Sequence, residues 1–298
     1  MMDDHHRPVA ALRKLRAADP GIPGTARTVV IGDIDGCTDW SGALRGVTAV
    51  IHCAARVHVM NDDARDALAE YRRTNVEGTL NLARQAASAG VRRFVYLSSI
   101  KVNGEATRAG ESFSADDVAA PLDPYGISKH EAEQGLMAIG RSTSMQVSVV
   151  RPPLVYGPGV KANFLAIMRW VRKGLPLPLA AVTANRRSLV ALGNLVDLLV
   201  TCVDHQAAAG QVFLVSDGED LSTAGLIRAL ATAVDKPARL IYIPVALLKL
   251  VAWLLNRRDA MQRLAGNLQV DISKTRRLLG WNPPINVSEG MRRAAETQ

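Results

Sequence analysis

The chain has 298 residues, 48% hydrophobic and 21% charged, a globular balance that excludes a disordered or fibrous protein. Lysine and arginine number 36 against 28 acidic residues, an excess of eight that favours acidic ligands such as phosphates. Only 4% of residues are aromatic, and the excess charge is spread without a basic stripe, so no nucleic-acid partner is expected. This length suits one large α/β domain or two modest ones.

The N-terminal segment predicts neither a signal peptide nor a strand. Residues 1–18 contain frequent charges and no apolar core, so a charged segment and a helix are expected there. Cys37, Cys53 and Cys202 form no CxxC pair, which predicts a reducing compartment and no metal site. The apolar stretch Val245–Leu255 is too short to span a bilayer and predicts a buried helix. We expect a cytoplasmic protein without stable membrane insertion.

Short β-branched segments alternate with longer helical patterns along the first two thirds of the chain. This alternation is the signature of βα units on a parallel sheet and predicts an α/β, Rossmann-like, doubly wound fold. The predicted strands are Thr28–Ile31, Ala49–Cys53, Arg93–Leu97, Gln146–Val150 and Val212–Val215, and the predicted helices are Ala64–Ala89, Gly126–Ile139 and Asn194–Asp204.

After residue 159 the pattern becomes mostly helical, which predicts a smaller C-terminal lobe. Helices are expected at Asn163–Lys173, Thr223–Val234 and Pro244–Asn256, with a brief strand at 240–243. We place the Rossmann-like domain at 27–160 with 189–216, and the lobe at 161–188 with 217–298. Ligands of such sheets lie beyond the carboxyl ends of the strands, so the residues just after each strand are the candidates for function.

Tyr125 and Lys129 are the first candidate pair. They stand at i and i+4, so on a helix they share one face. An ammonium near a phenol lowers the phenol's pKa, and such a tyrosine can exchange a proton with a sugar hydroxyl. The same spacing is also compatible with a solvent-facing pair.

Other polar or small residues follow the predicted strands. Ser98 and Ser99 could hydrogen-bond a substrate or form a turn that ends the strand. His52 and Cys53 lack a third convergent ligand, so His52 is expected in the core rather than on a metal. Asp33 could bind a ligand or belong to a turn.

In this order and spacing, the segments resemble the extended short-chain dehydrogenase/reductases, and within them the NAD-dependent epimerase/dehydratase family that acts on nucleotide sugars. The likeness runs from about residue 28 to the C-terminus. The matching segments are GDI at 32–34, HCAA at 52–55, NVEGT at 75–79, YLSS at 96–99, YGISK at 125–129, RPPLVYGPG at 151–159, Arg187 before an apolar run, and LLGWNPP at 278–284.

The resemblance implies a reaction at C4 of a UDP-sugar with NAD or NADP as cofactor. Ser99 would hydrogen-bond the reacting oxygen, Tyr125 would be the acid/base, and Lys129 would hold the nicotinamide ribose and tune Tyr125. A homodimer through helices near 66–89 and 126–140 is also expected. Further residues would line the cofactor groove (Asp33, Ile34, Cys53, Ala54, Ala55, Asn75, Pro152 and Pro153) or the substrate site (Lys101, Asn163, Arg187 and Arg263).

The sequence departs from the family at its N-terminal end. Family members begin with a strand, a GxxGxxG loop and a helix that receives the cofactor's pyrophosphate. The early glycines at 21, 24, 32 and 36 lack that spacing, so the chain is expected to begin after the second strand of the ordinary fold. Weak binding of NAD(H), an unreadable choice between NAD and NADP, and an exposed apolar sheet edge are then expected.

Two functional interpretations remain open from the sequence. The SSIKVNG segment at 98–104 resembles a 4-epimerase-like branch that includes reductases of UDP-4-keto-6-deoxy-N-acetylhexosamines in O-antigen synthesis. The chain is therefore interpreted as a UDP-sugar epimerase or 4-ketoreductase. The alternative is a non-catalytic remnant of the same family, and binding of NAD(H) distinguishes the two.

Overall fold

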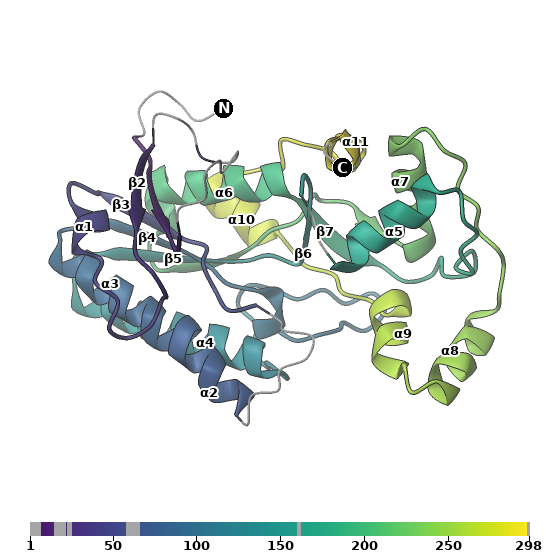
Figure 1. Cartoon of the computed structure of the whole chain (residues 1–298), viewed down its shortest axis with the longest axis horizontal. Helices are drawn as coiled ribbons and strands as arrows, with labels where there is room; N and C mark the ends of the chain where they lie inside the picture. Colours follow the sequence, from purple (N-terminus) through teal and green to yellow (C-terminus); the bar gives the residue numbers. More distant parts are fainter. Residues whose placement is uncertain (1–6, 15–21, 23–25, 58–65, 160–161, 297–298) are drawn as a thin grey trace. The chain divides into compact units, whose positions relative to one another are not determined.

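The computed structural model describes residues 7–14, 22, 26–57, 66–159 and 162–296 (Figure 1). The chain forms two compact units and passes between them several times. Unit 1 comprises residues 1–98, 121–149 and 206–211. Unit 2 comprises residues 99–120, 150–205 and 212–298. The functional boundaries at 160 and 188 expected from the sequence stay a prediction.

Unit 1 opens with a strand that the sequence analysis missed. Strands β1 (Val9–Leu12) and β2 (Arg27–Val30) pair in parallel, with Val9 opposite Arg27 and Leu12 opposite Val30. The expected helix within residues 1–18 is therefore wrong for residues 9–12, whereas the expectation that the chain begins after the second strand of the ordinary fold stays a prediction. Residues 1–6 and 15–18 of the expected helix lie outside the described residues.

A four-stranded sheet contains four of the five predicted strands, nearly residue for residue, whereas the strand predicted at Thr28–Ile31 is β2 of the two-stranded sheet. The order of the four-stranded sheet is β3 (Ala49–His52), β4 (Arg93–Leu97), β5 (Gln146–Arg151) and β8 (Gln211–Leu214). β3 and β4 are parallel, and the middle of β4 is fully buried. β3 lies at the sheet edge with Ile51 38% exposed, so the expected apolar edge is confirmed.

The helices of unit 1 begin with the short α1 (Ser41–Leu44). The helix predicted over 64–89 is a continuous helical run of three parts, although residues 64 and 65 are outside the described residues. An α-helical segment is followed by a π-helical turn and a second α-helical segment. The remaining elements are α2 (Ala67–Arg72), the π-helical η1 (Arg73–Gly78), α3 (Thr79–Ser88) and α4 (Pro124–Ser142).

Helix α4 begins where the sequence provides a strong start signal. The Asp123 carboxylate accepts a hydrogen bond from the Gly126 backbone N–H at 2.7 Å, and Pro124 occupies the first turn, where its missing N–H costs nothing. Helix α4 packs against α2, η1 and α3 (Figure 1). This packing fixes the first two turns of α4, which carry the candidate pair Tyr125 and Lys129.

Unit 2 is mostly helical, as predicted. In its three-stranded sheet, β6 (Leu154–Tyr156) is parallel to β7 (Arg187–Ala191), and β9 (Asp220–Leu221) is antiparallel to β7. Its core joins Tyr156, Phe164 and Met291. Its helices are η2 (Ile100–Val102), α5 (Ala162–Arg172), α6 (Leu192–Asp204), α7 (Thr223–Ala233), α8 (Val245–Leu254), α9 (Arg258–Ala265), α10 (Ser273–Leu279) and α11 (Val287–Glu296).

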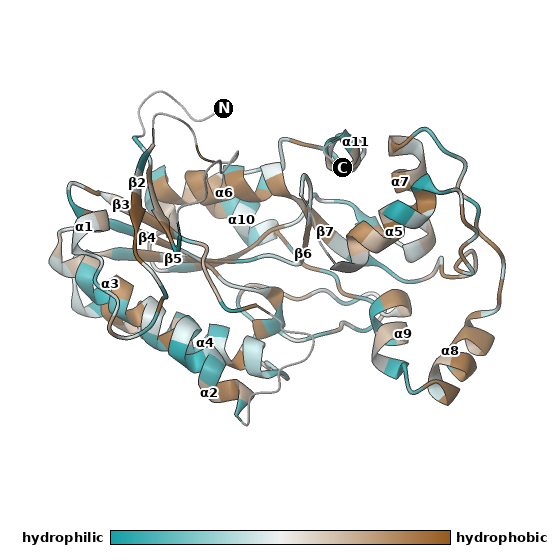
Figure 2. Ribbon diagram, viewed as in Figure 1, coloured by the Kyte–Doolittle hydropathy of each residue, from teal (hydrophilic) through white to brown (hydrophobic). Residues whose placement is uncertain are grey.

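Two expectations for this unit are wrong. Helix α8 exists, but no residue of α8 is buried, and Figure 2 colours it strongly apolar. The expected strand at 240–243 is reduced to a single bridge between Leu177 and Leu240. Within the described residues, no helix has the combined length and apolar character needed to cross a bilayer.

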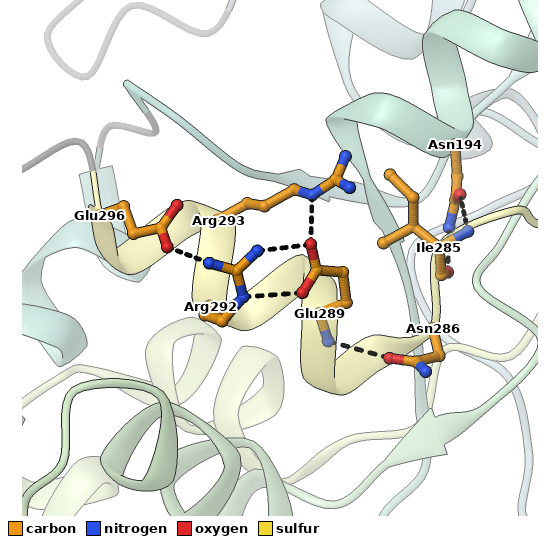
Figure 3. A network of polar contacts seen from close by, with 7 residues as sticks. All are labelled: Asn194, Ile285, Asn286, Glu289, Arg292, Arg293 and Glu296. Atoms are coloured by element: carbon orange, nitrogen blue, oxygen red, sulfur yellow. Dashed lines mark hydrogen bonds and ion pairs between the residues drawn. The ribbon is translucent and has the colours of Figure 1, made fainter.

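A buried polar network ties the C-terminal region to β6 and β7. Asp217 accepts hydrogen bonds from the Tyr156 hydroxyl and the Ala191 backbone N–H. Asn194 donates to Asp217. It also bonds both backbone groups of Ile285 (Figure 3). Because every one of these groups is satisfied, the network fixes the chain before α11 at little cost in desolvation.

The outer face of α11 carries exposed ion pairs. Glu289 accepts hydrogen bonds from Arg292 and Arg293, and these contacts lower the pKa of Glu289 to about 2 (Figure 3). Exposed pairs of this kind contribute little to stability because water and salt screen them.

Candidate active site

Tyr125 and Lys129 lie one turn apart at the start of α4, so the predicted shared face is confirmed. Tyr125 is half-buried, and its ring meets that of Tyr71 edge to face with centroids 6.1 Å apart. Lys129 is only 1% exposed, which excludes the interpretation of the pair as solvent-facing.

The Lys129 ammonium is held at the carboxyl end of β4. Its Nζ donates a hydrogen bond to the Leu97 carbonyl at 2.7 Å and lies 4.3 Å from the centre of the Tyr96 ring. Burial lowers the pKa of Lys129 to about 7, although the nearby Glu133 carboxylate opposes this shift. Lys129 is then about half protonated at neutral pH, a weaker charge than the full ammonium that the sequence analysis assumed.

Asn75 and Ser128 connect the segment after β3 to α4. The Asn75 side chain accepts a hydrogen bond from the Arg56 N–H at 2.8 Å and donates to the Arg56 carbonyl at 3.0 Å. It also donates to the Ser128 hydroxyl at 3.0 Å, and Ser128 donates to the Tyr125 carbonyl at 2.8 Å. The backbone of Tyr125 is thus positioned through a buried chain of hydrogen bonds.

The sequence analysis did not identify Ser128 and Glu133. Ser128 stands within the YGISK segment, and Glu133 follows Lys129 by four residues, the spacing at which opposite charges face one another on a helix. The spacing of Glu133 is a signal that could have been used. The partners of Ser128 are distant in sequence and carry no such signal.

His52 is a core residue, as expected. It is buried, and its Nε2 forms a 3.0 Å hydrogen bond with the Thr79 hydroxyl. Burial lowers the pKa of His52 to about 3, so the ring is neutral over the physiological range. Cys53 and Ala54, which follow it, are exposed, and Ala55 is half-buried.

The turn after β2 approaches η1 closely. The Thr38 hydroxyl donates to the Asp33 carbonyl at 2.8 Å and accepts from the Asp35 N–H at 2.9 Å. Ile34 lies against Gly78, where a Cβ atom would come within 2.6 Å of its side chain. The Asp33 side chain is exposed and forms an ion pair with Arg13.

Ser99 and Lys101 belong to unit 2, two and four residues beyond Leu97. The Ser99 hydroxyl accepts a hydrogen bond from the Lys101 N–H at 3.3 Å. This contact forms a turn at the end of the strand, which the sequence also allowed as the role of this serine. The Lys101 ammonium lies 3.2 Å from the Glu105 carboxylate. Pro152 and Pro153 are buried, and the Pro152 carbonyl accepts from the Ile100 N–H.

The remaining predicted substrate residues are distributed over three elements of unit 2. Arg187 opens β7, is partly buried, and donates to the Gly266 carbonyl at 3.4 Å. Burial lowers the pKa of Arg187, unlike a solvated surface residue. Arg263 is exposed on α9, and Asn163 lies in the first turn of α5 with its side chain outside the described part.

The parallel sheet, with Lys129 held at the carboxyl end of β4, is the arrangement of Rossmann-like folds, in which ligands lie beyond the carboxyl ends of the strands. A family model described as the NAD dependent epimerase/dehydratase family matches residues 1–216. The UDP-glucose 4-epimerase of Vibrio cholerae is 52% identical over 266 residues, covering 89% of this chain and 81% of that protein. This chain belongs to the NAD-dependent epimerase/dehydratase family and is an enzyme of the UDP-glucose 4-epimerase-like kind.

Solved structures support the fold. UDP-glucuronic acid 4-epimerase from Bacillus cereus, in complex with NAD, has a TM-score of 0.77 at 19% identity, covering 99% of this chain and 91% of that chain. UDP-glucose 4-epimerase from Thermotoga maritima, with UDP-glucose, has a TM-score of 0.77 at 19% identity, with coverage of 98% and 91%. At this level of identity the likeness concerns the fold alone.

Proposed function

We propose that this enzyme oxidises and re-forms the C4 carbinol of a UDP-sugar with NAD, which makes it a 4-epimerase. The observation that carries the proposal is the position of Lys129. Its ammonium is buried one helical turn from Tyr125 and bonded to Leu97, two residues before Ser99. The 52% identity to a UDP-glucose 4-epimerase supports the choice of reaction.

The chain's residues fit the nicotinamide end of NAD better than they fit its pyrophosphate. Ser98 has a buried hydroxyl without a hydrogen-bond partner within the described residues, and small exposed side chains follow β3. Tyr125 and Lys129 would hold the nicotinamide ribose. Further lining is proposed for Asp33, Ile34, Cys53, Ala54, Ala55, Asn75, Pro152 and Pro153. The 298 residues contain no GxxGxxG cradle for the pyrophosphate.

The protein's part in the reaction is proton transfer and orientation. Bound NAD would supply reversible hydride transfer at C4. In our proposal the Tyr125 phenolate would accept the C4–OH proton when the sugar is oxidised and would return it when the C4 hydroxyl is re-formed on the other face. Ser99 donates a hydrogen bond to the same oxygen, and the Lys129 ammonium stabilises the phenolate. Protons and electrons balance over the cycle.

We assign recognition of the UDP diphosphate to unit 2. The proposed contacts come from Lys101, Asn163, Arg187 and Arg263, because a guanidinium suits bidentate phosphate binding. We also propose a role in surface polysaccharide synthesis and a cytoplasmic location. The enzyme would form a homodimer through the helices at 66–89 and 126–140. The SSIKVNG segment favours UDP-4-keto-6-deoxy-N-acetylhexosamine 4-reduction, with NADP possible in place of NAD, as the second candidate.

The Tyr125→Phe variant tests the proposal through interconversion of UDP-glucose and UDP-galactose with added NAD. Loss of the hydroxyl removes the proton carrier, so we expect turnover to fall by about 10²–10⁴-fold. The matched control is Tyr242→Phe, because Tyr242 is an exposed tyrosine of unit 2. Near-normal turnover in Tyr125→Phe contradicts the mechanism.

The same preparations distinguish the alternatives. Reduction of a UDP-4-keto sugar by NADH or NADPH without epimerisation identifies the reductase. Absence of NADH binding in calorimetric titration of the folded chain identifies the non-catalytic remnant.

A further inference from the structure

Helix α8 presents an apolar stripe to solvent. Leu247, Leu250, Val251 and Leu254 follow the i, i+3, i+4, i+7 spacing of one helix face, and each is substantially exposed. Leu254 is 66% exposed, and Leu255 beyond the helix end is equally so. Exposed stripes of this kind on an otherwise well-packed protein mark interaction surfaces.

The opposite face of α8 anchors the helix to unit 2. Val245 and Leu248 pack against a buried cluster that includes Val171, Leu179 and Ile227. At about 100° per residue, the direction midway between Val245 and Leu248 lies roughly 140° from the centre of the stripe, so the two sets occupy different sides of the helix. The orientation of the exposed stripe is therefore fixed by packing.

Basic residues flank the stripe along the sequence. Between Asp235 and Asp259 the sequence has five cations and no acidic residue: Lys236, Arg239, Lys249, Arg257 and Arg258. These five account for more than half of the chain's net charge of +8, so positive charge is concentrated in this segment. All five side chains are exposed.

Trp253 stands at the border between the apolar and the basic residues. It is about half exposed, and the Arg258 guanidinium lies 5.6 Å from the centre of its ring. Tryptophan and arginine at the edge of an apolar helical face are typical of the boundary between acyl chains and headgroups.

We propose that α8 lies in the interface of an anionic lipid bilayer and docks the enzyme reversibly on that surface. Apolar side chains would enter the acyl boundary while the flanking cations meet lipid phosphates. A symmetric contact with a second copy would bring the same five cations face to face, which opposes self-association through this patch. The docking is independent of the proposed reaction.

Vesicle flotation of the full chain tests the docking. Vesicles of phosphatidylcholine with phosphatidylglycerol should retain the protein, and phosphatidylcholine alone or high salt should release most of it. Leu250→Ser with Leu254→Ser should weaken partitioning at least about tenfold. Arg257→Gln with Arg258→Gln should weaken it by about fivefold for each charge removed.

The matched control places the same change on exposed apolar residues outside α8. Val118→Ser with Leu122→Ser removes two residues that are 90% and 74% exposed and should leave partitioning unchanged. A blue shift in tryptophan emission on vesicle binding should disappear in Trp253→Phe. Substitutions of these exposed side chains should leave the melting temperature of each variant unchanged. A loss of vesicle binding can then not be attributed to unfolding.

Three results overturn the proposal. The first is absence of binding to the mixed vesicles. The second is binding that both the leucine variant and the arginine variant retain. The third is a concentration-dependent dimer that the leucine variant abolishes without any vesicle binding, which would assign the stripe to a second copy.

Discussion

His52 illustrates how burial of a single titratable side chain links stability to pH. Its ring is enclosed between the sheet and α3, and its described hydrogen bond is to Thr79. The pKa of His52 is lowered to about 3, whereas an unfolded chain binds the proton near pH 6.5. Acid therefore favours the unfolded state, and stability should be lost progressively as pH falls from about 6.5 towards 3.

We predict that the free energy of unfolding falls by about 2 kcal/mol through His52 alone between about pH 7 and pH 5. Urea unfolding at the two pH values measures the loss, and His52→Gln should be less sensitive to pH by the same amount. The glutamine amide can still reach Thr79, so the variant removes the titration more than the packing. Equal pH dependence in both proteins would contradict the assignment.

Lys129 is a buried side chain whose charged form is partly stabilised by neighbouring protein groups. The Leu97 carbonyl, the Tyr96 ring and the Glu133 carboxylate partly replace water around its ammonium, and the pKa of Lys129 remains about 7. A lysine that titrates near neutrality can alter its charge when its surroundings change. The positions of these groups give the candidate pair a physical basis beyond its sequence spacing.

At the scale of elements, the turn after β2 and η1 constrain each other through a glycine. A Cβ atom on Gly78 would lie 2.6 Å from the Ile34 side chain and 3.1 Å from the Asp35 backbone nitrogen. The side chain could rotate away, but the backbone could not move without displacing the whole turn. Gly78 therefore permits the close approach of the helix.

Gly78→Ala should destabilise the protein by about 1–3 kcal/mol, since overpacking outweighs the better helix propensity of alanine. Gly42→Ala in α1 is the matched control, because its Cβ would meet only one side-chain atom at 4.0 Å. There the change should be neutral or stabilising by up to about 1 kcal/mol. Thermal melts of both variants test the difference, and equal melting temperatures would refute it.

The elements that sequence reasoning located best are the buried parallel strands. β4 matches the predicted Arg93–Leu97 at both ends, because a strand buried on both faces appears as a continuous apolar run between turn signals. β1 was missed because three of its four residues, Ala10, Ala11 and Leu12, are good helix formers and charges flank the segment. The pattern of α8 predicted the helix, but composition does not say whether other elements cover it.

For the candidate site, the helical pairing of Tyr125 and Lys129 was readable from spacing, but the polar contacts around it were not. The Leu97 carbonyl and the Asn75–Ser128 bond come from residues far apart in sequence. The roles assigned to the individual site residues stay predictions.

At the scale of the molecule, the two units share their strands. The chain passes from unit 1 to unit 2 within β5, between residues 149 and 150, and again within β8, between 211 and 212. Neither unit can unfold without breaking a strand to which the other contributes. This connectivity couples the stability of the two units.

We therefore predict one cooperative unfolding transition for the whole chain. Calorimetric and van't Hoff enthalpies should agree, and fluorescence and far-ultraviolet dichroism should give the same midpoint. As a perturbation of unit 2, Met291→Ala should lower the single midpoint without splitting the transition, because Met291 is fully buried in that unit's core. Two resolved transitions would show that the units unfold separately.

The π-helical turn η1 has a consequence for how the sequence can change. A π-helical turn accommodates one residue more than an α-helix of the same rise. Deleting one residue between Arg73 and Gly78 would let the run wind as an ordinary α-helix, with α2 and α3 keeping their orientation relative to one another. Tyr71 would stay buried, but Asn75 lies inside the turn, so its side chain would be removed or redirected and its bond to Ser128 lost. Related chains can therefore lose a residue here without disturbing the packing of α2, and such chains should lack the Asn75–Ser128 contact.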